Sequence, residues 1–205
     1  MQKIHIKFVK GVFVMKPTIV FAHPWDGSFN RAILDEVTSN LKDYYMIDLY
    51  QDGFNPVMSA EDLAVYNAGK SHDPHVAKYN EILDDTDEII FIFPIWWYDM
   101  PAILRGFFDK VMLADSAFTA DETGLKAIRH IDKTVVFTTS FASTEDLIHK
   151  FGDPFHGTIL SATFEMVGFH NAKWINYGSI EASTEEERKA FLTNIKNVMM
   201  PGSKV

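Results

Sequence analysis

The stretch "EIIFIFPIWWYDMPAILRGFFDKV", which runs from Glu88 to Val111, joins a continuous apolar run to a segment with helical spacing. Residues 89–93 are apolar on both sides of the chain, which predicts a strand buried on both faces of a sheet. Residues 100–113 predict a helix. Pro94 ends the strand because proline offers no N–H to a neighbouring strand. Three aromatic side chains therefore share a short turn after a buried strand: Trp96, Trp97 and Tyr98.

The same alternation of strand and helix recurs along the chain. Strands are predicted at 18–22, 44–50, 89–93, 132–140 and 172–178, and helices at 29–41, 60–66, 74–83, 100–113, 143–151 and 154–169. A last helix follows a predicted capping box of Ser183 and Glu186. Strands that alternate with helices in this way indicate a doubly wound α/β domain, with a five-stranded parallel sheet and helices on both faces.

Composition and charge restrict the classes of function. Of the 205 residues, 47% are hydrophobic and 23% are charged, as in an ordinary globular domain. The formal net charge of -9 argues against a nucleic-acid partner, whose phosphates would be repelled. No apolar run approaches the roughly 20 residues that span a bilayer, and the absence of cysteine excludes disulfide and thiolate chemistry. We expect a cytoplasmic protein without an integral membrane segment.

The chain is expected to form one domain at residues 16–205, preceded by an N-terminal extension at residues 1–15. The extension is mildly basic, and its apolar run is too short for a signal peptide. Ile4, Ile6 and Phe8 alternate with polar residues, so part of the extension could add an edge strand.

Ligands of an open parallel sheet bind outside the carboxyl ends of the strands, where the strand order reverses. The loops at that edge are "HPWDGSFN", "PIWWYDM" and "TTSFAST". The first loop leads into a helix whose free amides make an anion site, with Ser28 and Asn30 as side-chain donors and His23 nearby. It matches neither the dinucleotide fingerprint nor the P-loop, and Ser28 could equally be a simple N-cap.

The second loop lies between two prolines. Pro101 suits the first turn of the following helix, and Asp99 is the expected cap of that helix. The three aromatic residues would offer a flat ligand both stacking surfaces and exposed amides. The alternatives are that the tryptophans plug the core or form a subunit interface, and at this position of a parallel sheet we favour ligand contact.

The segments "FPIWWYDMPAILRGFFDKV", "FAHPWDGSFN" and "VVFTTS" resemble the flavodoxin-like NAD(P)H:quinone oxidoreductase family, and the resemblance extends from about Lys16 to the C-terminus. It implies a bound flavin, with FMN favoured over FAD because no adenine-binding feature is visible, and with the phosphate at the first loop. The implied cofactor-binding residues are His23, Ser28, Phe29, Asn30, Pro94, Ile95, Trp96, Trp97, Tyr98, Thr138, Thr139, Ser140 and Phe141.

The resemblance also implies an activity and an assembly. NADH or NADPH would reduce a quinone or a related aromatic acceptor by two electrons through the flavin, in a homodimer whose subunits complete each other's sites. Phe141 stands where some members carry a glycine and is expected to narrow the pocket. Some members use a Tyr and a His after the fourth strand. This chain has no tyrosine there, and His149 and His156 are its candidate catalytic residues.

Several alternatives stay open on sequence alone. They are an azo- or nitro-compound reductase, a one-electron carrier like flavodoxin, and an accessory subunit of a potassium efflux system. The aromatic pocket is larger than a carrier requires. No metal site is predicted, since His72 and His75 supply only two ligands in a loop. Hydrolase chemistry is not expected, because Ser140 and Ser143 lack a nucleophile-elbow context.

Overall fold

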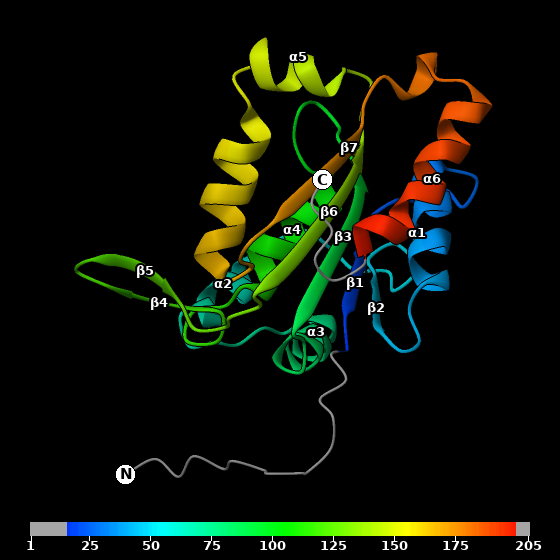
Figure 1. Cartoon of the computed structure of the whole chain (residues 1–205). Coiled ribbons are helices and arrows are strands. Elements are labelled where there is room, and N and C mark those ends of the chain that lie inside the picture. Colours follow the sequence, from blue (N-terminus) through cyan, green and yellow to red (C-terminus); the bar gives the residue numbers. More distant parts are fainter. Residues whose placement is uncertain (1–15, 200–205) are drawn as a thin grey trace.

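The computed structural model describes residues 16–199, so the predicted N-terminal extension lies outside the described residues. Five parallel strands form the central sheet in the order β2-β1-β3-β6-β7, which confirms the doubly wound α/β prediction (Figure 1). The strands are β1 (Thr18–Phe21), β2 (Tyr45–Asp48), β3 (Glu88–Pro94), β6 (Lys133–Thr139) and β7 (Lys173–Tyr177). The chain moves outward from β1 to β2 and returns to β3 on the other side of β1, so the strand order reverses between β1 and β3.

Helices cover both faces of the sheet (Figure 1). On one face lie α1 (Phe29–Ser39) and α6 (Glu185–Met199), which pack against each other. On the other lie α3 (Pro74–Asp84), α4 (Ala102–Val111) and a π-helix, η1 (Phe155–Phe164). The short helix α5 (Thr144–His149) crosses the carboxyl edge of the sheet, and α2 (Ala60–Tyr66) lies toward the opposite end. Two 3-10 turns, η2 (Glu165–Val167) and η3 (Ile180–Ala182), complete the helical elements.

The side chains of β3 alternate between two cores. Phe91 and Phe93 pack among the residues of α3, α4 and η1, whereas Ile90 and Ile92 pack among those of α1 and α6. All seven residues of β3 are buried, as its apolar sequence predicts. The strand therefore anchors the turn that follows it from both sides.

The structure corrects four details of the sequence prediction. A hairpin of β4 (Phe118–Asp121) and β5 (Gly124–Ala127) was not predicted; its strands are short and mostly exposed. The predicted helix at 154–169 is a π-helix followed by a 3-10 turn. The capping box of α6 is formed by Thr184 and Glu187, one residue later than expected. Pro101 is the N-cap of α4, and the Asp99 carboxylate instead accepts from the amide of Met100, at 2.7 Å.

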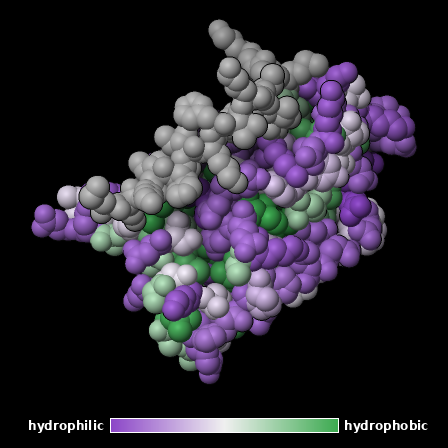
Figure 2. Space-filling view, turned by 90° about the horizontal axis from the view of Figure 1, so that it is seen from below, coloured by the Kyte–Doolittle hydropathy of each residue, from purple (hydrophilic) through white to green (hydrophobic). Residues whose placement is uncertain are grey.

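The two ends of the sheet differ in character. Seen from the amino ends of the strands, the molecule is largely hydrophilic, with small apolar patches (Figure 2). Exposed aromatic side chains gather in the loops at the opposite, carboxyl edge: Trp25, Trp96, Trp97, Tyr98 and Phe141. Among the described residues, no helix is long and apolar enough to cross a membrane.

Candidate functional site

The three loops predicted to bind a ligand meet at Thr139, the last residue of β6. Its hydroxyl accepts a hydrogen bond of 2.9 Å from Nδ2 of Asn30, in the first turn of α1. Its carbonyl accepts a bond of 2.7 Å from the amide of Ile95, the first residue after β3. Asn30 and Thr139 are both buried. The structure thus brings the loops after β1, β3 and β6 together beside the point of strand reversal.

The aromatic residues after β3 occupy a tight reverse turn. Trp96 and Asp99 form an isolated antiparallel bridge and exchange two backbone hydrogen bonds of 3.1 Å. The two central residues, Trp97 and Tyr98, have positive φ angles of 52° and 65°. Turns of this kind normally use Asn and Gly, because bulky side chains are strained at positive φ. Strain of this kind is typical of functional sites and is retained only where the surrounding structure holds it.

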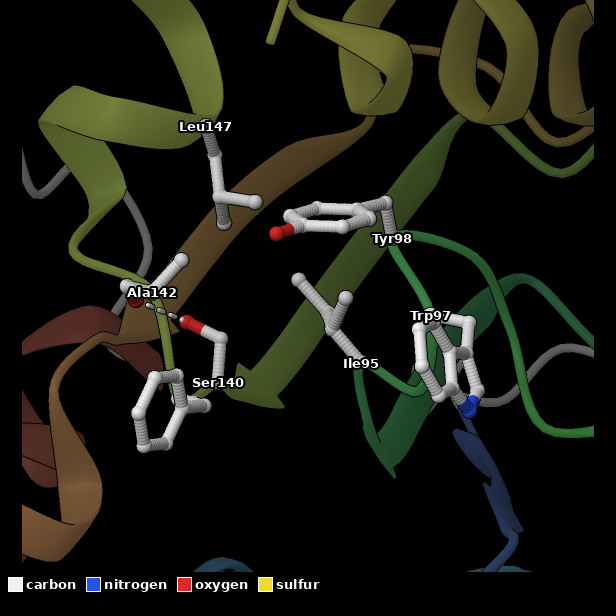
Figure 3. Close-up of a pocket in the computed structure, with 7 residues that line it drawn as sticks. Ile95, Trp97, Tyr98, Ser140, Ala142 and Leu147 are labelled. Atoms are coloured by element: carbon white, nitrogen blue, oxygen red, sulfur yellow. Dashed lines mark hydrogen bonds between the residues drawn. The ribbon is translucent and has the colours of Figure 1, made fainter. Parts of the chain in front are cut away.

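A cavity of about 270 Å³ lies between this turn and the loop after β6. Ile95, Trp97 and Tyr98 line it on one side, and Ser140, Phe141 and Ala142 line it on the other. Leu147 of α5 closes it at the top (Figure 3). The lining is mostly apolar and aromatic, which suits a flat conjugated ring. Phe141 lines the cavity as expected, although its side chain is largely exposed.

The start of α1 has the features of an anion site. The Ser28 hydroxyl oxygen caps the helix by accepting from the amide of Arg31 at 3.1 Å, so the N-cap interpretation is confirmed. This bond leaves the Ser28 hydroxyl free to donate. The amides of Phe29 and Asn30 have no hydrogen-bond partner within residues 16–199. Three donors at one helix start suit a single anionic group.

His23 extends this donor set toward the aromatic turn. Its Nδ1 accepts from the amide of Trp25 at 3.1 Å, which places the proton of the neutral ring on Nε2. Partial burial lowers the pKa of the imidazole, because it disfavours the charged ring. The ring meets Trp96 edge-on, with 6.1 Å between centroids. His23 is therefore a neutral donor between the first loop and the turn after β3.

Five of the residues expected to bind the cofactor have side chains engaged within the protein. The Asn30 side chain, expected as a donor to the anion, instead donates to the hydroxyl of Thr139. The Phe29 ring packs against Tyr177 and Phe191, at centroid distances of 5.0 and 6.0 Å, so that only its backbone amide faces the anion site. The Thr138 hydroxyl donates to Asn176 and accepts from Trp174, both at 2.8 Å. The Ser140 hydroxyl donates to the carbonyl of Ala142 at 2.7 Å. Pro94 is buried in the sheet opposite Thr139.

The two candidate catalytic histidines do not line the cavity. His149 is exposed at the end of α5. His156 lies on η1, where its Nδ1 is 2.8 Å from the carboxylate of Asp153 and its ring meets Trp174 edge-on at 5.2 Å. The structure gives neither residue a place beside the aromatic turn, and their catalytic role stays a prediction.

Sequence reasoning missed the contribution of α5. Leu147 closes the cavity, and Phe151, just after α5, packs on Tyr98 with 4.6 Å between ring centroids. Both residues belong to a segment predicted as helical on periodicity alone. Its position across the carboxyl edge depends on the connection that follows it, where Gly152 and Asp153 both have positive φ. No residue pattern in the segment points to the site.

Comparison with known proteins places the chain in a family. The Flavodoxin_2 family, described as having a flavodoxin-like fold, matches residues 15–198. An uncharacterized NAD(P)H oxidoreductase of Haemophilus influenzae is 28% identical over 188 residues, which covers 87% of this chain and 91% of that protein. The structure of the NAD(P)H:quinone oxidoreductase of Methanothermobacter marburgensis aligns with a TM-score of 0.81 at 28% identity. The alignment covers 90% of this chain and 96% of that protein's chain.

A more distant structure shares the fold alone. The FMN-dependent NADH-azoreductase of Bacillus anthracis, solved in complex with FMN, aligns with a TM-score of 0.66 at 17% identity. The alignment covers 90% of this chain and 97% of that protein's chain. The family match extends over nearly all described residues and includes the three loops that meet at Thr139. The chain therefore belongs to the Flavodoxin_2 family of flavodoxin-like proteins.

Proposed function

We propose that the protein is a flavin-dependent NAD(P)H oxidoreductase that reduces quinones or related aromatic acceptors by two electrons. The observation that carries the proposal is the convergence at Thr139 of an anion site, a strained aromatic turn and an apolar cavity. The relatives that cover nearly the whole chain have names of this class. Other members of the class, such as azo- and nitro-compound reductases, differ in the acceptor.

The residues present fit a flavin. The free amides of Phe29 and Asn30, with the Ser28 hydroxyl, supply donors for a phosphate at the positive end of the α1 dipole. The exposed ring of Trp97 supplies a stacking surface for the flavin ring system, and the apolar cavity beyond it leaves room for a second flat ring. We propose that His23, Trp96, Trp97 and Phe141 contact the cofactor through side chains, and that Phe29 contacts it through its backbone amide.

We propose FMN as the cofactor rather than FAD. The hollow beside α1 is lined by three carboxylates, those of Asp26, Asp48 and Asp52, and by one cation, Arg31. Arg31 is already paired with Asp26 at 3.3 Å and with Asp35 at 3.1 Å. A second phosphate placed there would meet net negative charge, whereas the amides of α1 suffice for one.

The chain's own residues would bind, orient and shield the reactants. When bound, the flavin supplies hydride transfer between the nicotinamide and the acceptor. Thr139 fixes the spacing of the loops by its bonds to Asn30 and Ile95. The bonds between Trp96 and Asp99 hold the aromatic wall in place, and Leu147 and Phe141 keep water from the ring face. Since one cavity serves both substrates, ping-pong kinetics are expected.

We also propose that the protein is a homodimer. An apolar groove of about 530 Å³ runs between α2, α4, the β4–β5 hairpin and η2. Its lining includes Leu63, Leu125 and Met166, which are exposed in the single chain. Trp97 is 94% exposed at the candidate site. A second copy would remove such apolar surfaces from water. Light scattering at micromolar concentration should show a dimer, and a fully active monomer would contradict this proposal.

The test of the function begins with the cofactor. Purified protein should bind FMN or FAD, and NADH or NADPH should bleach the bound flavin under anaerobic conditions. Mass spectrometry of the released cofactor distinguishes FMN from FAD. A one-electron carrier would instead show a stabilised semiquinone and negligible oxidation of NAD(P)H. Failure to bind either flavin would refute the proposal. The cytoplasmic location expected from the sequence stays a prediction.

A further inference from the structure

The cavity contains one uncommitted side-chain hydroxyl. Of its lining residues, Ile95, Phe141, Ala142 and Leu147 have apolar side chains. The Ser140 hydroxyl is used, since it donates to the Ala142 carbonyl at 2.7 Å and accepts from Asn176 at 2.8 Å. The Tyr98 hydroxyl, by contrast, has no hydrogen-bond partner within residues 16–199.

The orientation of the Tyr98 side chain is fixed by its surroundings. Its ring lies above Ile95, with the hydroxyl directed toward Leu147 and Ala142, while the indole nitrogen of Trp97 points away from these residues (Figure 3). The ring packs on Phe151, and its backbone lies in the reverse turn closed by Trp96 and Asp99. A donor fixed in this way loses little conformational freedom when it binds a ligand.

We infer that the Tyr98 hydroxyl is the side-chain donor that binds a carbonyl oxygen of the electron acceptor in this cavity. The inference rests on the proposed function and adds a residue that selects acceptors by their oxygen atoms. An otherwise apolar cavity holds any flat ring, but it orients only a ring that can accept a hydrogen bond at the right position.

The geometry of the turn separates Tyr98 from the flavin side of the site. Trp96 faces the first loop, where its ring meets His23 at 6.1 Å. Tyr98 faces the opposite way, toward Leu147 and Phe151 of the α5 region. A cofactor whose phosphate lies at the start of α1 would extend along the Trp96 side. The space under α5 is then left for the electron acceptor.

A hydrogen-bond donor beside the acceptor oxygens would favour quinone reduction. The hydride, supplied by NAD(P)H through the cofactor, forms a new O–H bond at one carbonyl oxygen of the quinone. The ring electrons shift, and the other carbonyl oxygen becomes a phenolate. A proton from water then completes the hydroquinone. The Tyr98 hydroxyl would donate to the oxygen that gains the negative charge, and such a charge-assisted bond is stronger than the bond to the neutral quinone.

Tyr98→Phe tests the inference, because it removes the hydroxyl and keeps the ring contact with Phe151. The matched control is Tyr44→Phe, just before β2, where the hydroxyl also has no hydrogen-bond partner among residues 16–199 and the ring packs on the α1–α6 core. Calorimetry measures binding of 1,4-naphthoquinone and of naphthalene to the oxidised, flavin-loaded protein without NAD(P)H. Steady-state kinetics give kcat and KM for 1,4-naphthoquinone.

Tyr98→Phe should weaken binding of naphthoquinone by about three- to tenfold, the effect of one lost hydrogen bond, and leave naphthalene binding unchanged. The kcat should fall further, by about tenfold or more, because the bond strengthens as charge develops. Reduction of the bound flavin by NAD(P)H should keep its rate. Tyr44→Phe should match the wild type in each measurement.

Three outcomes would overturn the inference. Equal weakening of naphthoquinone and naphthalene binding would mean that the substitution only disturbs packing. Loss of FMN affinity with unchanged naphthoquinone binding would assign the hydroxyl to the flavin. Unchanged kinetics in an active Tyr98→Phe variant would refute the role of Tyr98 and leave the proposed function standing. If the wild type itself oxidises no NAD(P)H with the quinone, the proposed function fails, and naphthoquinone binding still reports on the hydroxyl.

Discussion

The side-chain amide of Asn30 donates a 2.9 Å hydrogen bond to the hydroxyl of Thr139, across 109 positions of sequence. The bond is buried and joins the first turn of α1 to the last residue of β6. The Thr139 carbonyl meets the amide of Ile95, so one residue connects all three loops of the candidate site. The spacing between the anion site and the aromatic turn therefore depends on Thr139.

Replacing Thr139 by valine should destabilise the protein by about 1–3 kcal/mol, because the buried amide of Asn30 loses its acceptor. The affinity for flavin should also fall, because Thr139 connects the loops of the candidate site. Thr134→Val is the matched control in the same strand, since the buried Thr134 hydroxyl has no partner among the described residues and its removal should be neutral or stabilising. Urea denaturation measures both effects, and equal effects of the two substitutions would refute the role of Thr139.

Replacing Ser28 by alanine should lower flavin affinity by an order of magnitude or more, because a hydrogen bond to a charged group is worth about 1.5–3 kcal/mol. The same change removes the N-cap of α1, which costs about 1 kcal/mol of stability. Ser59→Ala removes the N-cap of α2 and controls for that loss. Fluorescence titration with FMN should show weaker binding in Ser28→Ala alone, and equal affinities would place the phosphate elsewhere.

Replacing Trp97 by asparagine should raise the free energy of unfolding by about 1 kcal/mol, because asparagine tolerates the positive φ that strains tryptophan. Turnover should fall, since the largest exposed surface of the aromatic turn is lost. Trp25→Asn is the control, as Trp25 is an exposed tryptophan without positive φ and should gain no stability. If Trp97→Asn is less stable than the wild type, the strain interpretation is wrong.

Replacing Lys110 by methionine should destabilise the protein by about 3–5 kcal/mol, because the buried carboxylate of Asp62 and the partly buried carboxylate of Asp73 then lose their cation. The Lys110 ammonium is almost fully buried, 2.8 Å from the Asp73 carboxylate and 2.9 Å from the Asn55 carbonyl. The control is Lys189→Met, which breaks an exposed i,i+4 pair with Glu185 and should change stability by less than about 0.5 kcal/mol. Urea denaturation near neutral pH compares the two variants.

The Lys110 pair also predicts a pH dependence. Burial raises the pKa of Asp73, but its hydrogen bonds with Lys110 and His75 outweigh burial, so the pKa lies below its usual value. The folded state thus holds its proton less tightly than the unfolded state. The resulting stability is present above about pH 4, the usual range of Asp, and is lost as the pH falls further. Lys110→Met should flatten this acid-side loss, and an unchanged acid profile would contradict the assignment.

Much of the fold follows from local patterns in the sequence. The apolar run of β3 specifies a central strand, and alternating elements specify a parallel sheet with a ligand edge. The β4–β5 hairpin escapes prediction because its register depends on neighbouring segments and little of it is buried. The sequence offers two pairs with the spacing of a capping box before α6, Ser183 with Glu186 and Thr184 with Glu187. Spacing alone does not distinguish them, and the structure uses the second pair.

Only part of the candidate site can be predicted from the sequence. Its three loops are identified by their place after strands, and Ser28 by its position before a helix. The reverse turn at Trp97 and Tyr98 contradicts the propensities of both residues, so no local rule predicts it. The links from Thr139 to Asn30 and Ile95 join distant segments, and the position of α5 depends on tertiary packing.

Anaerobic stopped-flow reduction of the flavin-loaded protein by NADH and by NADPH tests the central claim most directly. Bleaching of the flavin absorbance by at least one nicotinamide within seconds, followed by reoxidation on mixing with 1,4-naphthoquinone, is the predicted result. Comparison of the two nicotinamides also identifies the preferred donor. A bound flavin that neither nicotinamide reduces on the timescale of seconds would contradict the oxidoreductase function and favour a one-electron carrier.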